Sequence, residues 1–398
     1  MSSEPVIAPS VNRVVSVDAY RGFVMFLMMA EVLSLHRLAE AFPKSETWKF
    51  LAEHQTHVEW RGCSLHDLIQ PSFSFLVGVA LPFSLASRRR KGEPLGISAL
   101  HAIWRSALLI FLGIFLRSMG RSQTNFTFED TLTQIGLGYF PLFLLGLRRW
   151  RTQWIALIVI LVGYWAAFAY YPLPTADFNY KLAGVDPAWS HNATGFAAHW
   201  NKNTNAAWAF DRWFMNRLPR AHPFTNNAGG YSTLSFIPTL GTMILGLIAG
   251  GGLRVETCRW NKLAWMISTG LVGLALGYAA DRYGICPSVK RIWTPSWDLF
   301  SGGWCFLILS GFYLITDIIG FQSWSFPLRV IGANSIAAYM MAHVFNEFVV
   351  NSFKTHLGRR IFQTFGAAYE PLVIGATILA VYWLILFWMY RRKIFLRV

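Results

Sequence analysis

Histidines and acidic residues are concentrated in one short stretch of the chain, residues 54–67. The stretch holds His54, His57 and His66 together with Glu59 and Asp67. An imidazole is both a nucleophile and a base near neutral pH, and a neighbouring carboxylate can fix its tautomer. We therefore expect acid–base or nucleophilic chemistry by one histidine that is oriented by one acid.

This stretch has two other interpretations. A zinc site is the first, but the histidine spacings, three and then nine residues, differ from the HExxH pattern of helical zinc sites, so we expect no metal. Residues 54–67 also fit a polar loop before a membrane span, with Trp60 as an aromatic anchor at the interface. On composition alone, this structural role weighs as heavily as the catalytic one.

The elements that must position these residues are membrane helices. The 398 residues are 54% hydrophobic and 14% charged, whereas about a quarter of a soluble domain is charged. A membrane-spanning helix needs about 20 apolar residues. Candidate spans are 19–36, 68–87, 102–119, 132–147, 152–171, 232–250, 262–280, 299–317, 329–350 and 371–390. We therefore predict an all-α integral membrane protein, a bundle of about ten transmembrane helices.

Clusters of lysine and arginine predict the orientation of this bundle. The clusters at 88–91, 148–151, 254–262 and 391–393 follow the second, fourth, sixth and tenth spans, so all four belong on the cytoplasmic side. Both termini are then cytoplasmic, with residues 1–18 as an N-terminal segment and 19–398 as a single membrane domain. The loop at 172–231 is external, and its length predicts a functional role or a small structure of its own.

Net charge and cysteines narrow the class of partners. The net charge of +15 lies in short clusters between apolar runs, which indicates contact with anionic lipid headgroups rather than with nucleic acid. The four cysteines have no metal-binding spacing. Cys63 and Cys286 both fall in expected external loops, where a disulfide is one option.

Ionisable residues inside the expected spans are candidates for function because burying them is costly. Glu31 lies deep in the first span, where substrate binding and a structural ion pair are equally open. Arg21 lies nearer the cytoplasmic face. In the third span we expect Arg117 to be an interface anchor and Arg105 to bind a phosphate or to support a helix contact.

The span at 329–350 carries Asn334, Ser335, His343 and Glu347. His343 and Glu347 are four residues apart, so a continuous helix would place them on one face near its outer end. An acid–base pair, a substrate site and a plain buried hydrogen bond are all consistent with this spacing.

Several motifs in order resemble the heparan-α-glucosaminide N-acetyltransferase family and its bacterial relatives. Ser16-Val-Asp18-Ala-Tyr-Arg21-Gly22 resembles its (S)xDxxRG start, and residues 57–71 resemble its H-x-x-W-x-G…DLVFP segment. Shorter resemblances follow at 132–136, 210–212, 287–296, 332–336 and 390–395. Together they cover nearly the whole chain.

The resemblance implies an enzyme that transfers an acetyl group from cytoplasmic acetyl-CoA to an amino sugar or glycan on the other side of the membrane. It implies that His57 is the acetyl acceptor or the general base, with Asp67 or Glu59 fixing its tautomer. Candidate acceptor-binding residues are Glu31, Trp60, Gln134, Lys290, Trp293, His343 and Glu347. Candidate residues for binding CoA are Arg21, Arg105, Asn334 and Ser335.

The chain departs from the family pattern on the acceptor side, which leaves the acceptor open. Relatives usually have Asn near position 32, where this chain has Val32, and the span-nine histidine of the family falls on Ala342. We expect a bacterial inner membrane, with a homodimer left open as an assembly. The alternative function is a transporter or lipid-binding protein whose buried charges carry a substrate.

Overall fold

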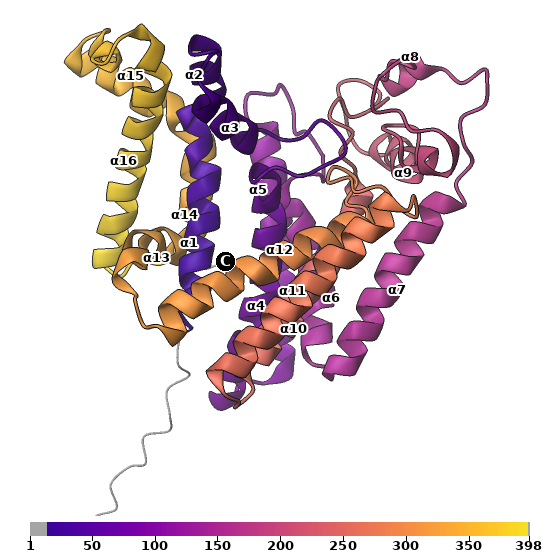
Figure 1. The fold of residues 1–398 in the computed structure, drawn as a ribbon, viewed down its shortest axis with the longest axis horizontal. Coiled ribbons are helices and arrows are strands. Elements are labelled where there is room, and N and C mark those ends of the chain that lie inside the picture. Colours follow the sequence, from indigo (N-terminus) through magenta and orange to yellow (C-terminus); the bar gives the residue numbers. More distant parts are fainter. Residues whose placement is uncertain (1–13, 397–398) are drawn as a thin grey trace, which may run out of the picture.

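The computed structural model describes residues 14–396, and its regular secondary structure in that range is entirely helical. Seven helices of the described residues are long and apolar enough to cross a membrane. They are α4 (Ile69–Arg90), α5 (Leu95–Ser118), α7 (Trp150–Ala169), α10 (Phe236–Arg254), α11 (Arg259–Arg282), α12 (Pro295–Tyr313) and α16 (Glu370–Arg391). The expected all-α integral membrane bundle is therefore confirmed. Figure 1 shows the long helices packed side by side.

The remaining three expected spans are also helical, but none is one long straight helix. The first is α1 (Val15–Met29), which continues through η1 (Ala30–Leu33) and then bends by 42° into α2 (Leu35–Ala41). The bend falls at Ser34, whose φ of 49° lies in the left-handed region. The helices α6 (Thr131–Gly146) and α14 (Ser335–Val344) are apolar but shorter. By length and composition, the described residues thus hold seven spans, or eight with the bent pair, rather than ten.

The expectation of one continuous helix over 329–350 is wrong. The chain forms α13 (Phe326–Ala333), α14, and α15 (Asn346–Leu357), with breaks at Asn334 and Phe345. Asn334 leaves the helical region at φ −129°, ψ 45°, and its buried side chain bonds to the backbone of Ile394 and Leu396. Contacts with the end of the chain therefore accompany the first break.

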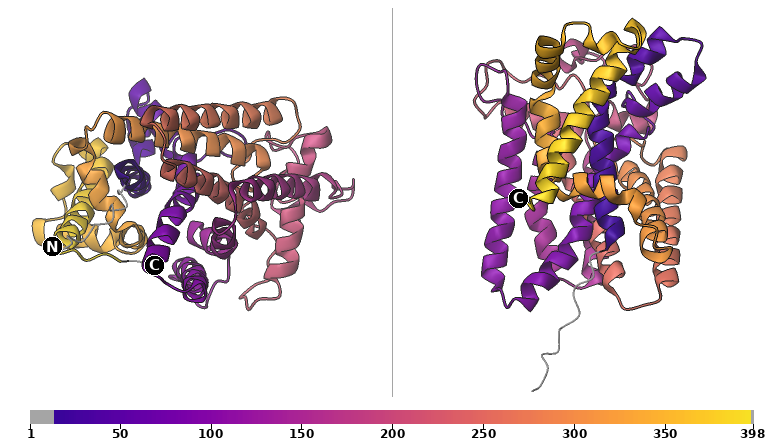
Figure 2. Two further views of the ribbon diagram at one scale, coloured as in Figure 1. Left: turned by 90° about the horizontal axis from the view of Figure 1, so that it is seen from below. Right: turned by 90° about the vertical axis from the view of Figure 1, so that its left-hand side faces the viewer.

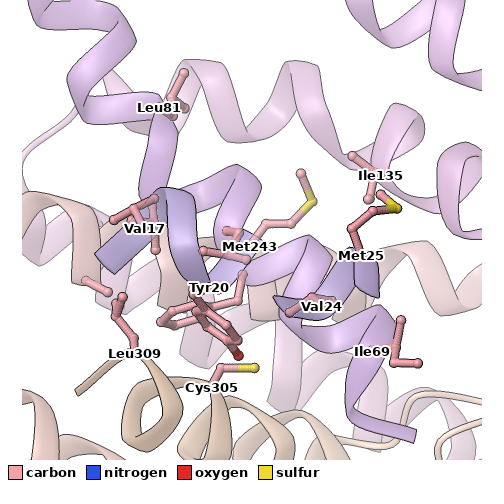
Figure 3. Close-up of a cluster of buried hydrophobic side chains, with 14 of the residues drawn as sticks. Val17, Tyr20, Val24, Met25, Ile69, Leu81, Ile135, Met243, Cys305 and Leu309 are labelled. Atoms are coloured by element: carbon pink, nitrogen blue, oxygen red, sulfur yellow. The ribbon is translucent and has the colours of Figure 1, made fainter. Parts of the chain in front are cut away.

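Close contact between α4 and α10 forms the centre of the bundle. A Cβ added at Gly78 would lie 1.9 Å from the carbonyl oxygen of Met243, and one at Gly246 would lie 1.9 Å from that of Phe75. Such small residues let membrane helices approach until their backbones touch. The apolar core around them includes side chains from α1, α4, α6, α10 and α12, such as Val24, Ile69 and Met243 (Figure 3).

The long segment 172–231 folds into a small structure, as its length predicts. It contains α8 (Tyr180–Ala183), η3 (Gly195–Trp200) and α9 (Ala206–Met215), and it lies beyond the end of α7, at the same end of the bundle as α2 and α3 (Glu46–Gln55) (Figures 1 and 2). Trp200 packs with Trp60, Phe168 and Ile292 in a buried cluster. The segment is thus joined to the loop that carries His57.

Two sequence expectations concern the ends and the cysteines. Of the expected cytoplasmic segment 1–18, residues 1–13 lie outside the described residues, and α1 already begins at Val15. Cys63 and Cys286 are free thiols in the structure, so the disulfide considered for them is not formed there.

Candidate active site

A cavity of about 520 Å³ opens beside His57, and we call it the histidine cavity. It lies among the end of α1 with η1, the start of α4, the end of α5, the start of α6, α14, and the loops that carry His57, Asn227 and Lys290. Its polar lining comprises His57, His66, His343, Glu31, Glu129, Asp130, Arg117, Lys290, Gln70, Thr131, Asn227, Tyr231 and Tyr339. Acids, bases and hydroxyls therefore surround one space large enough for a small polar molecule.

Asp67 shapes the loop that carries His57. One of its carboxylate oxygens, Oδ2, accepts hydrogen bonds from the backbone N–H of Val58 (3.2 Å) and from the backbone N–H and hydroxyl of Ser64 (3.0 Å each). The side chain is only 1% exposed, which fits the rule that buried charges are hydrogen-bonded. The carboxylate is thereby held rigidly on the inner side of the loop.

The other oxygen of Asp67 contacts the His57 ring. Oδ1 lies 2.8 Å from Nδ1 of His57, which is hydrogen-bond distance. A carboxylate can only accept, so this contact requires the proton on Nδ1 and leaves the lone pair on Nε2. The ring is 37% exposed and lines the cavity, so the histidine is poised as a nucleophile or a base there.

Lys290 completes a triad, although it is more than two hundred residues away in the chain. Its Nζ lies 3.2 Å from Oδ1 of Asp67 and 3.0 Å from Nδ1 of His57, with the side chain 5% exposed. Nδ1 cannot donate to Asp67 and accept from Lys290 at once. We therefore assign the Lys290 hydrogen bond to Asp67, which leaves the nucleophilic tautomer of His57 intact.

The loop that carries Lys290 is fastened to the loop that carries His57. Val289 forms an antiparallel bridge with Arg61, and the Arg291 guanidinium donates to the carbonyl oxygens of Gly229 (2.7 Å) and Val58 (3.4 Å). The neighbouring Ile292 accepts a hydrogen bond from the Tyr164 hydroxyl at 2.9 Å. These contacts hold the ammonium group in place without help from a regular helix.

The surroundings of the triad favour a neutral imidazole at His57. Burial lowers the pKa of His57 below its ordinary value, and the charge of Lys290 acts in the same direction, while the hydrogen bond to Asp67 opposes both. Burial also lowers the pKa of Lys290. The imidazole of His57 is consequently neutral at neutral pH, which is the form that attacks an acyl group.

A second histidine lies against the first. The rings of His57 and His66 have centroids 4.5 Å apart, and Nε2 of His66 lies 3.0 Å from Oε1 of Glu31. Glu31 thus reaches the cavity from η1, directly after α1. Of the described residues, no three His, Cys, Asp or Glu side chains are arranged to hold a metal ion.

Another part of the cavity wall is built around Asp130. Its carboxylate accepts from Arg117 (3.2 Å) and from the Tyr339 hydroxyl (3.4 Å), and the His343 ring stacks on Tyr339 with centroids 4.4 Å apart. Burial raises the pKa of the adjacent Glu129. Arg117, which we expect to anchor the membrane interface, lines the cavity and pairs with Asp130.

The structure brings together only some of the residues singled out from the sequence. His57, Glu31, Lys290 and His343 line the histidine cavity, and Asp67 lies directly behind His57. Glu347 is on α15, beyond the break at Phe345, so the helix face expected for it and His343 does not exist.

Other predicted site residues have structural partners. The exposed carboxylate of Glu59 accepts from Trp189 (3.4 Å) and His191 (3.1 Å), so of the two candidate acids Asp67 is the one that contacts His57. Trp60 and Trp293 are buried in apolar clusters. The Gln134 amide donates to backbone carbonyls, at 2.6 Å to Phe128. Their roles in binding an acceptor remain predictions.

A second cavity, of about 1460 Å³, lies at the other end of the same helices, and we call it the cationic cavity. It is lined by the last turns of α4 and α10, the first turns of α1, α7 and α11, and the end of α12. Its cationic residues are Arg89, Arg90, Arg254, Arg259 and Lys262. Clusters that the sequence assigned to one side of the membrane therefore meet around one space.

The four residues expected to bind CoA line neither cavity. Arg105 stacks on the ring of Tyr139 at 4.6 Å and donates to its hydroxyl, while Asn334 is occupied by the end of the chain. Their contact with CoA remains a prediction. The arginines of the cationic cavity cluster after expected spans two and six, and this clustering in the sequence is a signal for an anion-binding site as well as for orientation.

The fold and the two cavities define a multi-pass, all-helical membrane protein with a histidine–carboxylate–lysine site at one end of its bundle. No protein-family model matches the chain. It is similar to a human protein named heparan-alpha-glucosaminide N-acetyltransferase, with 24% identity over 97% of this chain, and to the mouse protein of that name, with 22% identity over 98%. The chain is related at the family level to these proteins, and it spans 60% and 61% of their lengths.

Proposed function

We propose that this protein is a membrane-bound acyltransferase that moves an acetyl group from cytoplasmic acetyl-CoA to an amino sugar or glycan on the other side of the membrane. The observation that carries the proposal is the contact between Asp67 and His57, which leaves Nε2 of a neutral imidazole facing a polar cavity. The names of the human and mouse relatives support the same reaction class.

Two routes use this imidazole, and both begin with Nε2. In the covalent route, Nε2 attacks the thioester carbon, the C–S bond breaks, and the thiolate of CoA leaves and takes a proton from water. The resulting acetyl-imidazolium keeps its Nδ1 proton, and the adjacent Asp67 carboxylate balances its charge. In the direct route, Nε2 takes the proton of the acceptor amine while that amine attacks the thioester carbon; the C–S bond then breaks, and the thiolate of CoA leaves and takes this proton from His57.

The cationic cavity is a suitable place for the nucleotide part of the donor. CoA carries phosphates, and arginine is well suited to bind them. Phe73 in the histidine cavity and Pro82 in the cationic cavity both lie on α4, and about 1.5 Å of rise per residue separates them by about 13 Å. A long, flexible donor that is held at the cationic end can place its acetyl group near His57.

The proposal also fixes an orientation. The basic clusters support a cytoplasmic cationic cavity, an external histidine cavity and cytoplasmic termini, because lysine and arginine are enriched in cytoplasmic loops. A bacterial inner membrane with anionic lipids fits the chain, and a homodimer remains open. Two cavities at opposite ends of one bundle also suit the alternative, a transporter.

Labelling distinguishes these functions. Purified protein in detergent is incubated with acetyl-CoA that is radiolabelled in the acetyl group, with and without glucosamine. We expect label on His57 or on glucosamine, and loss of both in His57→Ala but not in His36→Ala, which changes an exposed histidine outside the cavity. Absence of label from both protein and sugar in the wild type would refute the enzyme and favour the transporter.

A further inference from the structure

We propose that His66, held by Glu31, is the base that takes the proton of the acceptor when the acetyl group leaves His57. This inference rests on the covalent route of the proposed function. It assigns a second histidine a separate task in the second half of the reaction.

The covalent route needs such a second base. Once Nε2 of His57 carries the acetyl group, its lone pair is used, and Nδ1 keeps its proton because Asp67 accepts from it. Lys290 is engaged with the same carboxylate oxygen. His57 therefore cannot also accept the proton that an attacking amine or hydroxyl must lose.

His66 is placed to accept that proton. Its ring lies 4.5 Å from that of His57, centroid to centroid, and both rings line the histidine cavity. Its Nε2 is 3.0 Å from Oε1 of Glu31, so the carboxylate holds the proton on Nε2 and leaves the lone pair on Nδ1. Among residues 14–396, no hydrogen-bond partner occupies this Nδ1.

The step balances as follows. The acceptor nitrogen or oxygen attacks the acetyl carbon, the bond from that carbon to Nε2 of His57 breaks, and its electron pair returns to Nε2. The proton of the acceptor passes to Nδ1 of His66. The new imidazolium donates from Nε2 to the Glu31 carboxylate, which stabilises its charge, and then releases a proton to water.

Glu31 also explains how the base is kept ready. It lies on η1, just before the bend at Ser34, and its partner His66 lies on the short turn before α4. The side chain of His66 is only 7% exposed, and its hydrogen bond to Glu31 fixes which ring nitrogen carries the proton. The two residues therefore form a unit that is separate from the Asp67–His57–Lys290 triad.

The test separates the two half-reactions. Wild type, His66→Gln, Glu31→Gln and the control His36→Gln are loaded with radiolabelled acetyl-CoA, and label on His57 is measured. The donor is then removed, and loss of label is followed after addition of glucosamine or hydroxylamine. Hydroxylamine is a strong nucleophile that is unprotonated at neutral pH, so it depends less on a base.

We expect His66→Gln to load like the wild type. Its release of label to glucosamine should be about 10²-fold slower than that of the wild type. The KM for glucosamine should be unchanged, and release of label to hydroxylamine should stay near the wild-type rate. Glu31→Gln should show a smaller loss of the same kind, and His36→Gln none. A purely structural role for His66 would instead slow loading and both releases together.

Three results would overturn the inference. The first is release from His66→Gln to glucosamine at the wild-type rate, and the second is an equal loss with both nucleophiles. The third is an unlabelled His57 in a wild type that still acetylates glucosamine, which refutes the covalent route and this base while leaving the proposed function intact. If wild type labels neither His57 nor glucosamine, the proposed function itself has failed.

Discussion

Asp67 and His57 are ten residues apart in the chain, and their side chains meet at 2.8 Å between Oδ1 and Nδ1. The same carboxylate holds three backbone and side-chain donors of its own loop through Oδ2. One buried acid therefore both folds the loop and sets the tautomer of the imidazole. This relationship underlies the first two predictions.

Replacement of Asp67 by Asn should lower acetyl transfer by about 10²- to 10⁴-fold. The amide can donate to Nδ1, which favours the tautomer with the proton on Nε2 and removes the nucleophilic lone pair. Initial rates with labelled acetyl-CoA measure the effect. Ser64→Ala is the matched control, because it removes hydrogen bonds of the same loop to Oδ2 and to the backbone of Thr56 and Asp67 but leaves the contact between Oδ1 and His57, and it should cost less than tenfold. Equal losses in both variants would mean that Asp67 acts only on the loop.

The pH dependence of loading follows from the lowered pKa of His57. A histidine with a lowered pKa stays neutral, and so nucleophilic, to a lower pH than an ordinary histidine, so the acidic fall in loading should be shifted to lower pH. In Lys290→Met, the loss of a nearby positive charge raises the pKa of His57, and the acidic limb should move to higher pH. Lys202→Met, which removes a cation stacked on Trp189, should leave the limb in place. An unmoved limb in Lys290→Met contradicts the assignment.

Arginines of the cationic cavity should determine the affinity for the donor. Arg254→Gln and Arg89→Gln should each raise the KM for acetyl-CoA about tenfold, since a hydrogen bond to a charged group contributes about 1.5–3 kcal/mol. The kcat should change little, because the acetyl group reacts at the other cavity. Arg149→Gln, in the cluster before α7 but outside the cavity lining, is the control. Unchanged KM values in both cavity variants would place the nucleotide elsewhere.

Contact between α4 and α10 should limit stability. In Gly246→Ala the new methyl group would lie 1.9 Å from the Phe75 carbonyl oxygen, so the helices must separate, at a cost of about 1–3 kcal/mol or more. Thermal unfolding in detergent should show a clear decrease in Tm. Gly251→Ala is a matched control on the same helix, because its methyl group would meet nothing within 4 Å. Equal Tm values for the two variants would argue against a tight helix contact.

The sequence by itself determined the class of the protein and part of its site. Apolar runs of about twenty residues have no stable state in water, so composition alone predicts membrane helices, and seven of them are confirmed among the described residues. His57 and Asp67 are close in the chain, so a single short loop suffices to join them. Local patterns predict features of this kind because few conformations are involved.

Only the tertiary structure decided the rest. Lys290 reaches Asp67 across 223 positions, and Glu31 meets His66 only because the end of α1 lies beside the start of α4. Likewise, the apolar pattern of 329–350 predicts one helix, but Asn334 is bonded to the end of the chain and the helix breaks there. Hydrophobic periodicity predicts which face of a helix is buried, but it does not predict which distant polar group that face will contact.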